Sequence, residues 1–110
     1  MNDAYRIQTI LFDMGMSPKF VGCMYLVESI LIAAKNKMLL GNLSKGLYSE
    51  IAAKLNTSPA CVERSLRSAI SATYERGSLS KFFDRRPTNK QFLMYLLRRM
   101  NENASISNIH

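Results

Sequence analysis

Side chains that could carry enzyme chemistry are sparse in this sequence of 110 residues. Its single histidine is His110, where we expect no neighbouring element to hold it in a catalytic geometry. The two cysteines, Cys23 and Cys61, have neither a histidine partner nor a second cysteine pair for zinc. The carboxylates are scattered, and there is no glycine-rich phosphate loop. We therefore expect no enzyme, no metal and no cofactor, and so few cysteines predict a reduced, cytoplasmic setting.

Positive charge is the strongest chemical feature that remains. Fifteen Lys and Arg residues stand against eight Asp and Glu, which gives a formal net charge of +7. The excess is concentrated in residues 77–110, which carry six basic and two acidic residues. Such a balance predicts a polyanionic partner, with nucleic acid ahead of a membrane. The apolar runs are interrupted by Gly22, Glu28 and Ser29, so no membrane span and no membrane partner are expected.

The elements that must position these charges are predicted to be helices. Apolar residues recur at helical spacing throughout, without strand-like alternation or an Asn-Gly or Asp-Gly hairpin turn. The fold class is therefore all-α, a compact bundle of about five to six helices. We expect one domain over residues 1–100 and a frayed tail over 101–110. Capping and stop signals predict helices over about 3–14, from Ser17-Pro18 to 36, over 47–56 and 59–76, and from Thr88 or Asn89 to about 100.

The segment over about 47–76 has the spacing of a helix-turn-helix. Two helices that cross steeply need a small residue at their contact, which Ala52 supplies. Leu55 closes the first helix, and Val62 stands ten residues after the alanine, where it would fill the angle between the helices. Asn56 tolerates the left-handed conformation that ends the first helix, and the sequence Thr57-Ser58-Pro59 would cap and start the second.

Burial of Val62 and Leu66 predicts which side chains of the second helix face outward. In a DNA-binding unit, outward residues near its start enter the major groove. Arginine can hold guanine O6 and N7 with two hydrogen bonds, and a glutamate can accept from a cytosine amine. The alternative is an ordinary helical hairpin with a solvated arginine face. The outward row would comprise Ala60, Glu63, Arg64, Arg67 and Ser71.

Several residues near this motif could contact the DNA backbone, which adds affinity but carries no sequence information. Arg85-Arg86 and Arg98-Arg99 are further cations that could reach phosphates, although the latter pair could equally form a solvated face. The predicted phosphate contacts nearest the motif are Lys45, Tyr48, Lys54, Thr57 and Ser58.

A family resemblance rests on Leu47-Tyr48, Ile51-Ala52, Lys54, Asn56-Thr57, Val62-Glu63-Arg64, Arg67, Ala69-Ile70 and Arg76-Gly77. It extends to Tyr25-Leu26, Leu39-Leu40-Gly41, Pro87-Thr88-Asn89 and Phe92. These residues resemble the C-terminal DNA-binding effector domain of the stage-zero sporulation response regulator of endospore-forming bacteria. The resemblance covers most of residues 5–100. It implies a six-helix domain that binds a promoter box through the second motif helix, often as a head-to-tail homodimer on tandem boxes.

Three departures from the family pattern affect what the resemblance implies. The family carries an arginine at the position of Cys61 and a histidine at that of Ser68, so base readout at these positions is altered. The loop over 77–87 is about ten residues shorter than the family's, and the missing stretch holds a helix implicated in contacting the sigma subunit of RNA polymerase. No receiver domain accompanies this sequence, which we expect to be a free-standing effector or an excised domain.

Two functions follow as hypotheses. The first is a sequence-specific DNA-binding regulator of transcription, with Ala60, Cys61, Glu63, Arg64, Arg67 and Ser68 as base-reading positions. The second is a protein-interaction module or antagonist that pairs with a paralogous regulator or a sigma factor. Retention of both Arg64 and Arg67 favours the first, because a pure interaction module has no need of them. A thiol switch at Cys61 is a lesser alternative to an inert side chain.

Overall fold

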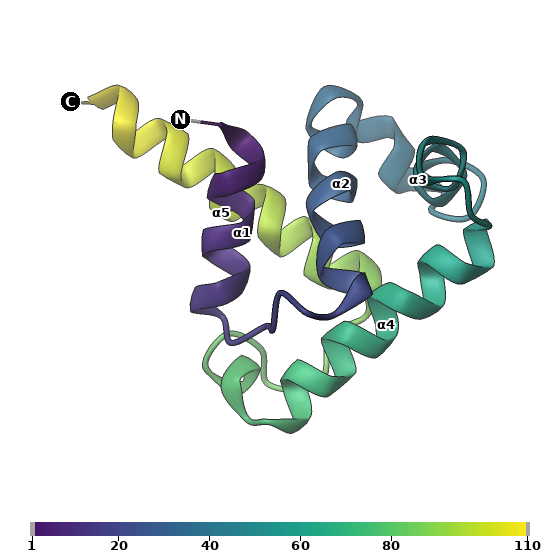
Figure 1. Ribbon diagram of the computed structural model, residues 1–110. Coiled ribbons are helices and arrows are strands. Elements are labelled where there is room, and N and C mark those ends of the chain that lie inside the picture. The colour runs from purple at the N-terminus through teal and green to yellow at the C-terminus, as the bar shows by residue number, and fades with distance from the viewer. Residues whose placement is uncertain (1, 110) are drawn as a thin grey trace.

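The computed structural model describes residues 2–109, with side chains described for residues 2–102, and this part of the chain is all-α. Figure 1 shows the helices gathered into one bundle, and no strand occurs within the described residues. None of the described helices combines the length and apolar character needed to cross a bilayer. The elements are α1 (Asp3–Asp13), α2 (Val21–Lys35), the 3-10 helix η1 (Lys37–Gly41), α3 (Leu47–Leu55), α4 (Pro59–Glu75), the 3-10 helix η2 (Ser78–Lys81) and α5 (Asn89–Ile109).

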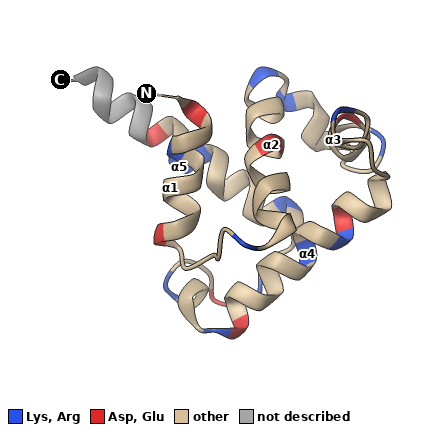
Figure 2. Cartoon of the chain, in the orientation of Figure 1, with Lys and Arg blue, Asp and Glu red and all other residues tan. Residues whose placement is uncertain are grey.

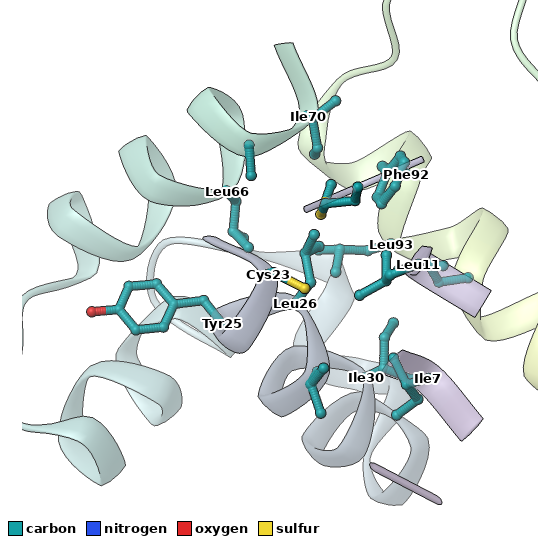
Figure 3. Close-up of a cluster of buried hydrophobic side chains, with 14 of the residues drawn as sticks. Ile7, Leu11, Cys23, Tyr25, Leu26, Ile30, Leu66, Ile70, Phe92 and Leu93 are labelled. Atoms are coloured by element: carbon teal, nitrogen blue, oxygen red, sulfur yellow. The ribbon is translucent and has the colours of Figure 1, made fainter. Parts of the chain in front are cut away.

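Helix α2 is the centre of the bundle, as its apolar circumference predicts. It contacts α1, α3, α4 and α5, and in Figure 1 it stands between α1 and α3 with α4 crossing at its base. Figure 3 shows its Leu26 and Ile30 among side chains from the other helices, including Leu11, Leu66 and Leu93. All five are fully buried. Each such side chain contributes about 1.5–3 kcal/mol relative to an exposed one.

A glycine lets α2 approach α4 closely. A Cβ atom at Gly22 would collide with the backbone carbonyl oxygen of Ser65 and lie 2.7 Å from the Cβ of Ala69. A backbone oxygen in a helix cannot move aside, so any side chain at Gly22 would force the two helices apart. This contact fixes the position of α4, the second helix of the predicted motif, on the core.

The second helix starts later than the sequence predicts. The Ser17-Pro18 signal closes only a turn, in which the Ser17 hydroxyl accepts a hydrogen bond from the Lys19 N–H at 3.2 Å. Phe20 then has an extended backbone, with φ −70° and ψ 132°, so the helix begins at Val21 without a side-chain cap. The cap-plus-proline signal is therefore correct at Ser58-Pro59 but wrong as a helix start at Ser17-Pro18.

The predicted start signals of the other helices are confirmed, whereas α5 continues to Ile109, past the end predicted near residue 100. The Asn2 side chain accepts from the Tyr5 N–H at 3.0 Å at the start of α1, and Gly15 after its end has φ 92°. At the start of α5, the Thr88 hydroxyl accepts from the Gln91 N–H while the Gln91 side chain accepts from the Thr88 N–H. This reciprocal capping box fixes where α5 begins. The frayed end predicted for residues 101–110 lies largely outside the part described with side chains, and it stays a prediction.

Candidate nucleic-acid interface

The turn between α3 and α4 has the geometry predicted for a helix-turn-helix. Asn56 ends α3 in the left-handed conformation, with φ 56° and ψ 54°. The Thr57 N–H then returns to the Ala52 carbonyl oxygen at 2.9 Å. The Ser58 hydroxyl accepts from the Cys61 N–H at 3.1 Å, and Pro59 occupies the first turn of α4. Each position of the turn therefore satisfies backbone groups that a helix end leaves unpaired.

The face of α4 that packs against the core is the predicted one. Val62, Leu66, Ala69, Ile70 and Thr73 are all buried, and Ala52 of α3 is buried at the crossing. The Thr73 hydroxyl donates to the Ala69 carbonyl oxygen at 2.8 Å, which satisfies the one polar group on this face. The opposite side of α4 is left to solvent.

The structure brings the predicted base-reading residues to that solvent-facing side. Ala60, Arg64, Arg67 and Ser68 are exposed, while Cys61 and Glu63 are half-buried at its two edges. We call the four exposed residues together with Ser71 the outer row of α4. Because Ala60, Ser68 and Ser71 have small side chains, a flat polar surface could approach this row closely.

Two members of this surface pair with each other. The Arg67 guanidinium donates from Nε to Glu63 Oε2 at 3.0 Å and from Nη2 to Glu63 Oε1 at 3.3 Å. Figure 2 shows that acidic and basic residues occur close together in the first half of α4. Within the described residues Arg64 has no hydrogen bond or ion pair, so its donors remain available to a ligand.

Asn89 ties the motif to the last helix, a contact that our sequence reasoning missed. Its side-chain amide donates to the Tyr48 hydroxyl at 3.0 Å and to the Glu63 backbone carbonyl oxygen at 3.2 Å. One residue of α5 therefore holds both helices of the motif. The only sequence signal was the presence of Pro87-Thr88-Asn89 among the residues that carry the family resemblance.

Tyr48 does not fit its predicted phosphate role. Its side chain is only 3% exposed, and its hydroxyl accepts the hydrogen bond from Asn89. Burial raises the pKa of Tyr48, which keeps the hydroxyl neutral. Apolar packing of the ring against the core outweighs exposure of its hydroxyl, so Tyr48 supports the motif from within.

The other predicted phosphate contacts lie at the surface, and one of them, Lys54, is held in an ion pair. Lys45 is exposed on the segment before α3, and Thr57 and Ser58 lie in the turn. Lys54 is exposed on α3, but its Nζ lies 2.7 Å from Oε2 of the Glu28 carboxylate on α2. That ion pair joins the motif to the core helix and partly neutralises the lysine.

Cys61 and Cys23 differ in their surroundings. The hydrogen bond with the Thr57 hydroxyl lowers the pKa of the Cys61 thiol, and the nearby Arg64 adds a smaller effect in the same direction. Burial raises the pKa of the Cys23 thiol, which lies in the core as predicted. Cys61 is the more reactive of the two, and its short side chain ends at the edge of the outer row.

The Lys54–Glu28 pair allows the phosphate role of Lys54 to be tested. We expect Lys54→Ala to weaken binding to all duplex sequences alike. The slope of log affinity against log salt concentration should become shallower by about one. Glu28→Gln keeps Lys54 and removes its partner, so it should strengthen binding to the same duplexes. Affinities measured over a salt series check both variants. An unchanged salt dependence in both would remove Lys54 from the set of phosphate contacts.

The fold and this surface define a class of protein. A small all-α domain with a capped helix-turn-helix, whose second helix presents arginines to solvent, has the architecture of a DNA-binding domain. Over residues 7–100 the sequence matches the family described as "Sporulation initiation factor Spo0A C terminal". The chain belongs to this family, whose members are DNA-binding domains of sporulation transcription regulators rather than enzymes. The match confirms the family resemblance inferred from the motif residues.

Proposed function

We propose that this protein is a sequence-specific DNA-binding regulator of transcription that reads the major groove with α4. The observation that supports this most is the setting of Arg64. Its side chain is exposed, has no partner among the described residues, and lies in the second turn of a capped recognition helix. An arginine held for structural reasons would be paired or packed. A free guanidinium on this face is suited to a bidentate contact with guanine O6 and N7.

The residues around Arg64 would make the other contacts to the DNA. Glu63 and Arg67 approach the bases as a preformed pair, so the carboxylate can accept from a cytosine amine while the guanidinium donates to an adjacent base or phosphate. Ala60 and Ser68 are small enough to let the helix enter deeply. Backbone contacts from Lys45, Lys54, Thr57 and Ser58 would set the register on the duplex. Such a protein would act on DNA in the cytoplasm, and we propose that it pairs head to tail on tandem boxes, as the family resemblance implies.

A protein-interaction role is the second candidate, and one surface favours it. Tyr5 and Phe12 of α1 and Met24 of α2 are 59%, 70% and 52% exposed. They line a groove of about 600 Å³ between the two helices. Exposed apolar side chains clustered around a groove are typical of surfaces that bind another protein, such as a paralogous regulator or a sigma factor.

Selection from a randomised duplex library, carried out at two salt concentrations, tests the proposed function. A sequence-specific regulator should enrich a defined box at both concentrations, with affinity that falls steeply as salt rises. The interaction module should enrich no sequence. Recovery of sequences indistinguishable from the starting library, by a protein shown to be folded, would contradict the proposal.

Cys61 provides a test of how this domain is related to its family. The thiol ends at the edge of the outer row, whereas an arginine at this position is long enough to reach a base edge. We expect Cys61→Arg to gain about 1–3 kcal/mol of binding to the family's promoter box, the size of one bidentate contact. Cys61→Ser, which removes the thiol without adding reach, should leave the affinity unchanged. Equal affinities of all three proteins for that box would show that α4 docks differently here.

A further inference from the structure

A groove of about 340 Å³ runs beside α4 on the side of α5, and it adjoins the outer row. It is bounded by the start of α5 and the segment before it on one side, and by α4 on the other. We call it the flank groove. Its lining residues are Leu43, Tyr48, Glu63, Arg67, Ser71, Arg86, Pro87, Thr88, Asn89 and Lys90.

The flank groove carries an unbalanced positive charge. Of its three basic residues, Arg67 is neutralised by Glu63, the only acidic residue that lines the groove. Arg86 and Lys90 have no acidic partner among the described residues, and both are exposed. Two unpaired cations therefore face one opening, where they repel each other unless an anion lies between or beside them.

The position of Arg86 is set by contacts on both sides. Its Nη1 donates to the Ser71 hydroxyl of α4 at 3.3 Å, which brings a loop residue onto the outer row. The next residue, Pro87, is buried, and Thr88 caps α5, so the chain around Arg86 is anchored. Lys90 follows in the first turn of α5. The contact with Ser71 holds Arg86 at the flank of α4, about two turns beyond Arg64, and Lys90 lines the same groove.

A helix that enters the major groove has a sugar-phosphate backbone on each side. The side of α4 that carries the flank groove would face one of these backbones when the outer row faces the bases. We propose that Arg86 and Lys90 clamp a backbone phosphate in the flank groove and so fix the register of α4 on the duplex. This inference rests on the proposed DNA-binding function and extends it to a phosphate site.

The salt dependence of binding to the selected box tests the clamp. The measured quantity is the slope of log affinity against log salt concentration. Arg86→Ala and Lys90→Ala should each make this slope shallower by about one, and the double variant by about two. Arg86→Lys keeps the charge and should retain the steepness. The matched control is Lys81→Ala, because Lys81 is an exposed cation at the end of η2 that does not line the groove. It should bind with the steepness of the unaltered protein. Thermal unfolding of each variant reports on its fold.

The outcomes separate the clamp from the proposed function. If the box is bound and Arg64→Ala loses its base preference, but Arg86→Ala and Lys90→Ala keep the full salt dependence, the clamp is overturned while the function stands. Equal losses in Lys81→Ala and Arg86→Ala would also overturn it, because the groove would then contribute nothing beyond overall charge. If no duplex is bound specifically, the proposed function fails and the clamp fails with it.

Discussion

Replacement of Val62 by aspartate should abolish cooperative folding of the domain. Val62 has no exposed surface and lies in the angle between α3 and α4. A carboxylate there would lose its hydration without gaining a partner, at a cost of several kcal/mol. The whole stability of a small domain is about 5–15 kcal/mol. The variant should therefore show a strongly lowered or absent thermal transition by circular dichroism, and loss of DNA binding with it.

The matched control places the same carboxylate on the opposite side of α4. Ser68 is exposed on the outer row, so Ser68→Asp should change the free energy of unfolding by no more than about 0.5 kcal/mol. This control separates the cost of burying a carboxylate from the effect of aspartate on helix formation. A Val62→Asp protein that unfolds cooperatively, close to the midpoint of the control, would show that the packing between α3 and α4 described above is wrong.

Arg64→Ala should have the largest effect on recognition. Loss of a bidentate contact to guanine weakens binding to the selected box by about 1–3 kcal/mol and relaxes the preference at one base pair. The free energy of unfolding should stay within about 0.5 kcal/mol, because the side chain is exposed and has no partner in the part of the chain that the structure describes. Affinities for the box and for each of its single-base variants check both parts.

Lys54→Ala serves as the contrast for Arg64→Ala. Both variants remove one positive charge from the motif, but Lys54 is expected to contact phosphate and so should weaken every sequence by the same factor. If the two variants gave the same uniform loss across all duplexes, Arg64 would be a backbone contact and not a base reader.

The motif itself was the part of the structure most fully specified by local sequence. Asn56, Ser58 and Pro59 each satisfy a conformational or hydrogen-bonding need of the turn, and such needs depend only on nearby residues. The buried face of α4 follows from apolar spacing for the same reason. These features could therefore be predicted without knowledge of the tertiary fold.

Contacts between distant segments could not be predicted in this way. The bond from Asn89 to Tyr48 spans 41 positions of sequence, and only the packing of α5 against α2 and α4 brings the two side chains together. The pairing of Lys54 with Glu28 has the same origin. Ser17-Pro18 is the opposite case. The sequence there has a local helix-start signal, but Phe20 has an extended backbone and α2 begins only after it. Tertiary packing decided each of these cases.

A single-atom change in the DNA shows whether Arg64 reads a guanine. In the selected box, the guanine whose preference depends on Arg64 is replaced by 7-deazaguanine, which lacks the N7 acceptor but keeps its base pairing. The unaltered protein should lose about 1 kcal/mol of binding, the size of one hydrogen bond, whereas Arg64→Ala should bind both duplexes equally. Equal losses in the two proteins, or no loss in either, would contradict the account.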